Sequence, residues 1–181
     1  MDSPTCDNRP HRCPALTLVE VLIVAVVLSI AALLAAPMVA QTDQTRLQAA
    51  ARLLIADVAF AQNESITHPD DPYAIKVDSV TASYSVVHDT GYPPFGCASA
   101  TVVTDPITSQ PYTTVFGGTG RGSQLAGVTI QTGAVLGGDD CVLFGQFGET
   151  DQSTPASVTL VAGGKTLTLS IDPISGEATT P

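Results

Sequence analysis

The first half of this sequence contains no glycine: all 15 glycines lie at or after Gly91. Tryptophan is absent, and only seven Lys and Arg residues stand against 17 Asp and Glu, for a formal net charge of −10. Because a nucleic-acid-binding face needs clustered basic side chains, this balance disfavours nucleic acid as a partner. Because turns favour glycine and helices disfavour it, its distribution predicts a helical first half and a turn-rich second half.

Motifs for catalysis and for metal or cofactor binding are also missing. The sequence has no G-x-S-x-G and no recognisable Ser/His/Asp order. The glycine-rich run Gly117–Gly122 lacks the Lys-Ser/Thr ending of a phosphate-binding loop, so we expect a flexible loop there. The four cysteines form no CxxC pair for zinc, and the Asp139-Asp140 pair is more typical of a solvated turn than of a calcium site. We therefore expect no enzyme activity, no cofactor and no metal.

The most prominent feature that is present is an apolar run, Leu16–Ala40. It has 25 residues, of which only Thr17, Glu20 and Ser29 are polar. A helix of that length spans about 37 Å, enough to cross a bilayer. Basic residues precede the run, which predicts a cytoplasmic N-terminus and an exported remainder.

Two interpretations of this run leave Glu20 without a role. One is a secretory signal peptide removed near Ala40-Gln41, although its apolar region would be about twice the usual ~7–15 residues. The other is a plain membrane anchor. A carboxylate at the centre of a membrane costs on the order of 2.5–3.5 kcal/mol, so such a residue usually has a partner.

A third interpretation explains Glu20. The segment Pro14–Ile23, PALTLVEVLI, resembles the cleavage and methylation motif of type IV pilins and type II secretion pseudopilins. The resemblance implies a leader over residues 1–15, a cut between Ala15 and Leu16 by a prepilin peptidase, and methylation of the new amine of Leu16. Glu20 would then be the fifth mature residue and would neutralise the terminal amine of a neighbouring subunit, so that its charge favours assembly.

Pro37 fits the same resemblance. It would be mature residue 22, where many pilins carry a proline that bends the helix by removing one backbone hydrogen bond. The alternative is that Pro37 marks only the end of the membrane helix over residues 16–40.

Beyond Ala40 the pattern becomes amphipathic without a helix breaker. Apolar residues recur at steps of four and three, which is the spacing of one helix face: Leu47, Ala51, Leu54, Val58 and Ala61. Charged residues, including Asp57, are expected to lie mostly off this stripe. The helix should continue over residues 41–67 and stop before Pro69 and Pro72.

Residues 68–181 are predicted to form a β-rich globular domain. Segments with strand-like composition are Tyr73–Val77, Ala82–Val87, Tyr112–Phe116, Val128–Gln131, Cys141–Phe144, Ser157–Ala162 and Lys165–Ile171. The last two flank Gly163-Gly164, which suits the positive φ of a two-residue hairpin turn. In the returning strand Leu167, Leu169 and Ile171 alternate with polar residues, so one face should be buried.

The C-terminal segments indicate which members of this family the chain resembles. Phe144–Gly148 and Ile171–Glu177 are similar to the close of H-type minor pseudopilins and their minor-pilin relatives. The resemblance implies an α+β, pilin-like fold, in which a long N-terminal helix packs on an antiparallel β-sheet domain. Once the leader with Cys6 and Cys13 is removed, Cys97 and Cys141 are the remaining cysteines, in a compartment that permits a disulfide. We expect them to form one, and the alternative is two buried thiols.

The function implied is that of a non-enzymatic minor pseudopilin of a type II secretion system. Such a subunit would be anchored in the bacterial inner membrane by a single pass, with its globular domain in the periplasm. Its partners would be other pseudopilins or pilins in the filament, the prepilin peptidase, and secreted cargo or the outer-membrane channel. The alternatives are a minor pilin of a type IV pilus, for adhesion or DNA uptake, and a secreted β-domain binding module.

Overall fold

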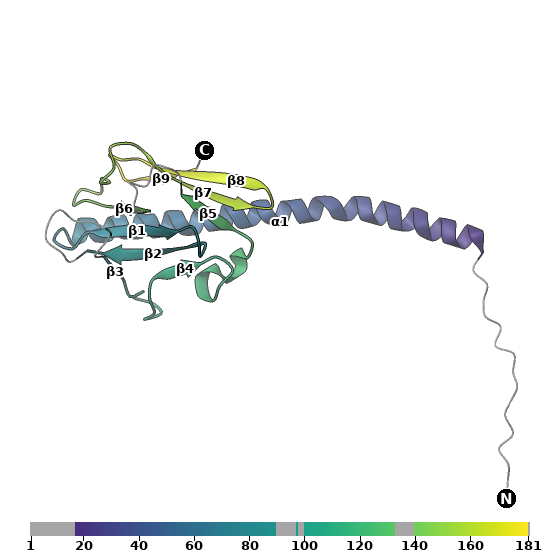
Figure 1. Cartoon of the computed structure of the whole chain (residues 1–181), viewed down its shortest axis with the longest axis horizontal. Helices are drawn as coiled ribbons and strands as arrows, with labels where there is room; N and C mark the ends of the chain where they lie inside the picture. The colour runs from purple at the N-terminus through teal and green to yellow at the C-terminus, as the bar shows by residue number, and fades with distance from the viewer. Residues whose placement is uncertain (1–16, 90–96, 98–99, 133–139, 181) are drawn as a thin grey trace, which may run out of the picture. The chain divides into compact units, whose positions relative to one another are not determined.

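The computed structural model describes residues 17–89, 97, 100–132 and 140–180, and for residues 32–41 it describes the backbone alone. The chain divides into two units, Met1–Val39 and Ala40–Pro181. Helix α1 (Leu18–Thr67) begins in the first unit and ends in the second, which also contains β1–β9 (Figure 1).

Helix α1 ends where the sequence predicts, just before the prolines at 69 and 72. The backbone N–H of His68 still donates to the Glu64 carbonyl, at 2.8 Å, and Pro69 has no N–H with which to continue the pattern. Within the described part of the chain, no helix is long and apolar enough to cross a membrane. Residues 32–40, whose side chains are not described, belong to the span expected over 16–40, which stays a prediction.

The first sheet is antiparallel and contains five strands, in the order β3-β2-β1-β6, with β4 also paired to β2. Its strands are β1 (Tyr73–Asp78), β2 (Ser83–His88), β3 (Thr101–Val102), β4 (Thr113–Val115) and β6 (Cys141–Leu143). Ile75 of β1 lies opposite Val86 of β2 and Val142 of β6, which sets three buried apolar side chains in one row.

The second sheet is antiparallel and contains four strands, in the order β5-β7-β8-β9. They are β5 (Thr129–Thr132), β7 (Ala156–Ala162), β8 (Lys165–Ile171) and β9 (Ala178–Thr179). The β7–β8 hairpin turns on Gly163 and Gly164, at φ of 56° and 76°, which confirms the predicted turn. In β8 Leu169 and Ile171 are buried as predicted, whereas Leu167 is half-buried.

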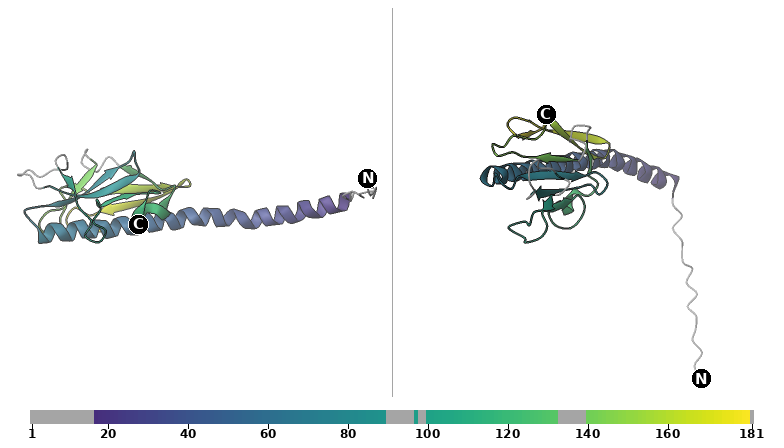
Figure 2. Two further views of the ribbon diagram at one scale, coloured as in Figure 1. Left: turned by 90° about the horizontal axis from the view of Figure 1, so that it is seen from below. Right: turned by 60° about the vertical axis from the view of Figure 1, so that its left-hand side comes forward.

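One apolar core joins the second half of α1 to both sheets. Figure 2 shows this part of the helix lying along one side of the two sheets. All five residues of the predicted stripe are at most 3 % exposed. Residues of the same core include Leu54 and Val58 of α1, Ile75 and Val86 of the first sheet, and Ile130, Leu160 and Leu169 of the second. The helix is therefore the surface on which both sheets bury their apolar faces.

The loop expected at Gly117–Gly122 is confirmed only for Gly117–Thr119, which form a turn. Its second half begins a 3₁₀ helix, η1 (Gly120–Leu125), whose Gly122 and Leu125 are buried. A Cβ at Gly122 would lie 2.1 Å from the Val115 carbonyl oxygen. The absence of a side chain at Gly122 therefore allows close backbone packing here. Glycine permits such close approach as well as conformational freedom.

Candidate functional site

Glu20 lies in the first turn of α1. The Thr17 carbonyl accepts a hydrogen bond from the Val21 N–H, and the Thr17 Oγ1 accepts one from the Glu20 N–H, each at 3.2 Å. Thr17 is thus the N-cap, and a Glu three residues later completes the sequence pattern of a capping box. A carboxylate in this turn also faces the positive end of the helix dipole. Ala15 and Leu16, the predicted cleavage and methylation positions, lie outside the described residues.

The apolar side chains that follow Glu20 are exposed. Between Leu18 and Ile30 the large ones are 48 to 81 % exposed, which leaves this part of α1 apolar on every side. A helix that is apolar all round is normally covered by lipid or by other helices. Pro37 falls within the bounds of α1, but its side chain lies outside the described residues, so the predicted bend stays a prediction.

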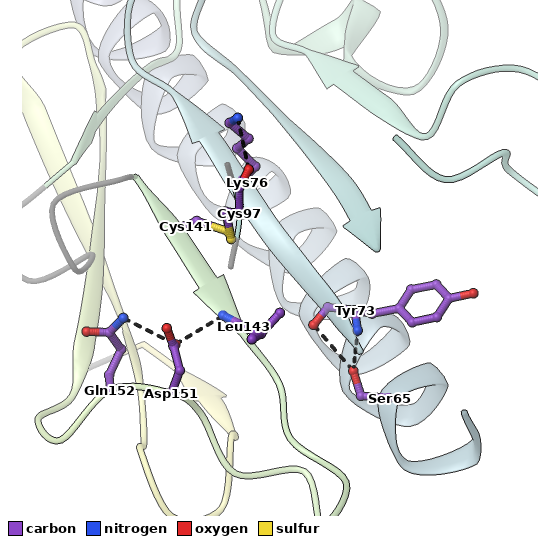
Figure 3. The surroundings of a disulfide bond; sticks show 8 residues. All are labelled: Ser65, Tyr73, Lys76, Cys97, Cys141, Leu143, Asp151 and Gln152. Carbon is purple, nitrogen blue, oxygen red and sulfur yellow. Dashed lines mark hydrogen bonds between the residues drawn. A yellow bond between two sulfur atoms is a disulfide. The ribbon is translucent and has the colours of Figure 1, made fainter. Parts of the chain in front are cut away.

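A disulfide joins Cys97 and Cys141, the pair that the sequence predicts. It ties the segment after β2 to the first residue of β6, across a Cα–Cα distance of 6.2 Å (Figure 3). Both cysteines belong to a second, smaller core with Ala74, Val87 and Leu143. Beside them the Lys76 Nζ donates to the Cys97 carbonyl at 3.5 Å.

The prediction that Asp57 lies off the buried stripe is wrong, because its side chain is only 1 % exposed. It follows Leu54 by three residues and precedes Ala61 by four, which places it on the same helix face. Its carboxylate accepts hydrogen bonds from the hydroxyls of Tyr84 and Tyr112, at 2.7 and 2.9 Å. It also accepts one from the Arg121 Nη2 at 2.6 Å, which makes an ion pair.

The aromatic side chains around this carboxylate are stacked. Phe60 and Tyr112 lie nearly parallel with ring centroids 5.1 Å apart, and the Arg121 guanidinium lies 4.9 Å from the Tyr112 centroid. Such a cation–π contact adds about 0.5–2 kcal/mol, depending on its exposure. Arg121 belongs to η1 and Tyr112 directly precedes β4, so these contacts fasten both segments to the last third of α1.

The electrostatics of this cluster favour neutral tyrosines and a charged arginine. Burial, and then the Asp57 charge, raise the pKa of Tyr84 far above its ordinary value, and the same causes raise the pKa of Tyr112. Burial alone would lower the pKa of Arg121, but the hydrogen bond and the charge of Asp57 outweigh it and the pKa rises. The arrangement therefore holds a fixed ion pair, which is a structural role.

Comparisons with known proteins identify the fold. No protein-family model matches the chain, and no curated protein matches it significantly. The type IV minor pilin FimU of Pseudomonas aeruginosa matches with a TM-score of 0.50 at 16 % identity, over 77 % of this chain and 91 % of FimU. The minor pseudopilin EpsH from the type 2 secretion system of Vibrio cholerae matches with a TM-score of 0.52 at 10 % identity, over 75 % of this chain and 96 % of EpsH.

The fold is pilin-like. This confirms the α+β part of the predicted fold class, a long helix packed on antiparallel sheets. The two similar structures belong to different assemblies, and at these identities the likeness concerns the fold alone. The pilin-like fold thus agrees equally with a secretion pseudopilin and with a minor pilin.

Proposed function

We propose that this chain is a non-enzymatic minor pseudopilin of a type II secretion system, assembled into a filament through the N-terminal part of α1. One observation carries the proposal: an all-round apolar helix segment with a carboxylate in its first turn is joined in sequence to a pilin-like domain. Apolar side chains that are about half or more exposed need to be shielded from water, and a bundle of like helices within a membrane shields them.

The assembly step follows from the charge of Glu20. Removal of residues 1–15 would create a cationic amine at Leu16, one helical turn before Glu20. A carboxylate and an amine of neighbouring subunits would neutralise one another in apolar surroundings, where each alone is unfavourable. Because the apolar run Leu16–Ala40 is 25 residues long, it would hold the chain in the inner membrane before assembly, with the β-rich unit in the periplasm.

The alternative is a minor pilin of a type IV pilus, which the likeness to FimU favours as much as the likeness to EpsH favours a pseudopilin. Within that alternative, DNA uptake is disfavoured by the basic side chains. Arg121 is paired with the buried Asp57, and Arg46 lies 4.0 Å from Asp43 and donates to the Ala126 carbonyl. Such dispersed and partly neutralised cations make a poor phosphate-binding surface.

The decisive experiment is the N-terminal mass of the full chain made together with a prepilin peptidase. We expect a membrane-associated product that begins at a methylated Leu16. A product that begins near Gln41 and is free in the periplasm would contradict the proposal, because the predicted assembly helix would then be a discarded signal peptide.

The role of Glu20 needs a control, because Glu20 also belongs to the N-terminal cap of α1. We expect Glu20→Ala to abolish co-purification with the other filament subunits while cleavage persists. Thr17→Ala removes the capping hydroxyl and keeps the carboxylate, so it should leave assembly largely intact. Equal losses in the two variants would mean that helix capping, not subunit pairing, accounts for the effect. Secretion of exported enzymes and pilus-driven motility in a deletion strain would then separate the two filament systems.

A further inference from the structure

Three large apolar side chains are exposed where α1 ends. Phe147 follows β6 and is 80 % exposed, Ile174 follows β8 and is 84 % exposed, and Ile66 in the last turn of α1 is 46 % exposed. We call these three residues the end patch. Figure 1 shows the β6–β7 and β8–β9 connections at the end of the β-rich unit where α1 stops. The end patch thus belongs to the second unit and is distinct from the apolar segment around Glu20.

Gln62 of α1 brings the two connections together. Its Nε2 donates to the Gly148 carbonyl at 2.9 Å and to the Ser175 carbonyl at 2.5 Å. The connections also touch directly: the Thr150 N–H donates to the Pro173 carbonyl at 2.9 Å. A Cβ at Gly148 would meet the Ile66 Cδ1 at 3.1 Å, so the end of α1 lies against the same backbone. These contacts make one continuous surface from three segments.

Hydrogen bonds hold the backbone beneath each exposed side chain. The Asp172 Oδ1 accepts from the N–H groups of Ile174 and Ser175, at 2.9 and 2.8 Å. The Glu149 Oε2 accepts from the Phe147 N–H at 3.0 Å. A backbone that is already ordered loses little conformational entropy when its side chains are covered, which favours binding. Large apolar groups held rigidly in water are the kind of anchor that protein interfaces use.

The surroundings of the end patch are acidic. The segments 62–73, 144–151 and 172–177 contain seven carboxylates and no lysine or arginine. An anionic lipid surface or a nucleic acid would be repelled from it. A second copy of this chain would bring the same excess of acid, since the whole chain carries a formal charge of −10. Charge complementarity therefore favours a partner whose contact surface is basic.

We propose that the end patch docks a different protein, through an apolar pocket that is bordered by lysine or arginine. Phe147 and Ile174 fill the pocket, and the surrounding carboxylates, such as Glu177, face the basic border. The proposal goes beyond the filament function and uses none of the residues of the N-terminal part of α1 around Glu20. It therefore stands or fails separately from the processing of Leu16.

The test places a photo-crosslinking residue in the full chain, in cells that naturally make it. p-Benzoylphenylalanine replaces Phe147 or Ile174 and, as matched controls, Val80 or Ile107, which are 92 and 90 % exposed. The structure places these controls in the β1–β2 turn and in the connection between β3 and β4. After irradiation, mass spectrometry identifies the adduct and the crosslinked segment of the partner.

We expect one protein adduct from positions 147 and 174 that is absent at 80 and 107, with lysines or arginines around the crosslinked segment. With the probe at 147, Glu177→Lys should reduce the yield by about tenfold, since like charges across an interface are strongly unfavourable. Glu177→Gln should reduce it less, and added salt should weaken the purified complex.

Several results would overturn the proposal. Positions 147 and 174 could give no more adduct than the control positions, or they could crosslink to a second copy of the chain or to lipid. The crosslinked segment of the partner could also be acidic, or the crosslinking yield could be unchanged by Glu177→Lys. The probes replace side chains that are at least 80 % exposed, so the thermal unfolding of each variant should match that of the unmodified chain. Correct processing at Leu16 combined with no adduct would refute the end patch while leaving the filament function intact.

Discussion

At the scale of single residues, Asp57 holds together segments that are far apart in the sequence. Its partners Tyr84, Tyr112 and Arg121 follow it by 27, 55 and 64 residues. A buried carboxylate is tolerated because these three donors replace the water that it loses. The consequence is an asymmetry: removing one partner is expected to destabilise the fold more than removing the whole group.

We predict that Arg121→Met lowers the free energy of unfolding by about 2–3 kcal/mol, less than the ~3–5 kcal/mol of a fully buried pair because the Arg121 side chain is 35 % exposed. Chemical denaturation of the full chain in detergent would measure the loss. In the double variant with Asp57→Asn, the charge that Arg121 neutralises is gone, so the two losses should not add. Strict additivity would show that the ion pair contributes nothing.

The tyrosines of the same cluster predict that the folded state loses stability at high pH. Burial raises the pKa of Tyr84 in the folded chain above the unfolded value near 10, so the folded state keeps its proton longer. The resulting stability is complete below about pH 10 and falls progressively as the pH rises further, because only the unfolded chain gains by ionising. Unfolding curves between pH 8 and 11 should show this decline.

Tyr84→Phe is the variant that isolates this effect. It removes the titrating hydroxyl and one hydrogen bond to Asp57, so stability at neutral pH should drop by about 1–2 kcal/mol. The fall above pH 10 should be shallower than in the unmodified chain. An unchanged slope would mean that another group controls the alkaline behaviour.

At the scale of elements, two glycines with similar backbone angles do different things. Gly164 in the β7–β8 turn has φ of 76° and open space where a Cβ would lie, whereas Gly176 before β9 has φ of 66° and no such space. A Cβ at Gly176 would lie 2.0 Å from the Gly148 carbonyl oxygen. Gly164 provides the positive φ that its turn requires. Gly176 does the same and also allows the β8–β9 connection to contact the β6–β7 connection.

We therefore predict that Gly164→Ala costs about 1 kcal/mol, from backbone strain alone, while Gly176→Ala costs about 2–4 kcal/mol, because strain and overpacking add. Thermal unfolding of the two variants would give the comparison. Amide hydrogen exchange should rise in the connections around Gln62 in the Gly176 variant only. Equal losses at both positions would contradict the contact.

The elements also show what local sequence can and cannot predict. The end of α1 and the β7–β8 hairpin were predictable, because prolines and a Gly-Gly turn act on adjacent residues. Strands β3 and β9 have two residues each, too few for an alternating pattern. The order of η1 depends on its packing against Val115, which no local pattern reports.

The site was predictable to a different extent. The cysteine pair followed from the sequence once the leader was excluded. Asp57 was missed because its charge argued against burial, although its spacing from Leu54 and Ala61 argued for it. A charged residue in register with an apolar stripe is itself a signal that donors come from elsewhere in the chain. The end patch was missed because hydrogen bonds between distant segments create it.

At the scale of the whole molecule, the disulfide between Cys97 and Cys141 restricts the unfolded chain. The two residues are 44 positions apart, and closing a loop of that length contributes about 4 kcal/mol in the chain-entropy model. We predict that the Cys97→Ser/Cys141→Ser variant unfolds at a clearly lower denaturant concentration than the oxidised chain. Reductant should lower the midpoint of the unmodified chain and leave the variant unchanged. Identical midpoints with and without reductant would contradict this prediction.

The short strands at the margins of the two sheets bear on solubility at high local concentration. Of the described edge strands, β3 and β9 have two residues each, β4 and β6 have three, and β5 has four. An edge strand offers unpaired backbone groups to any neighbouring chain, and a short one offers few. Subunits that lie close together would therefore offer one another only short edges for intermolecular strand pairing. The short length that made β3 and β9 unpredictable from sequence patterns also protects the protein against cross-β aggregation.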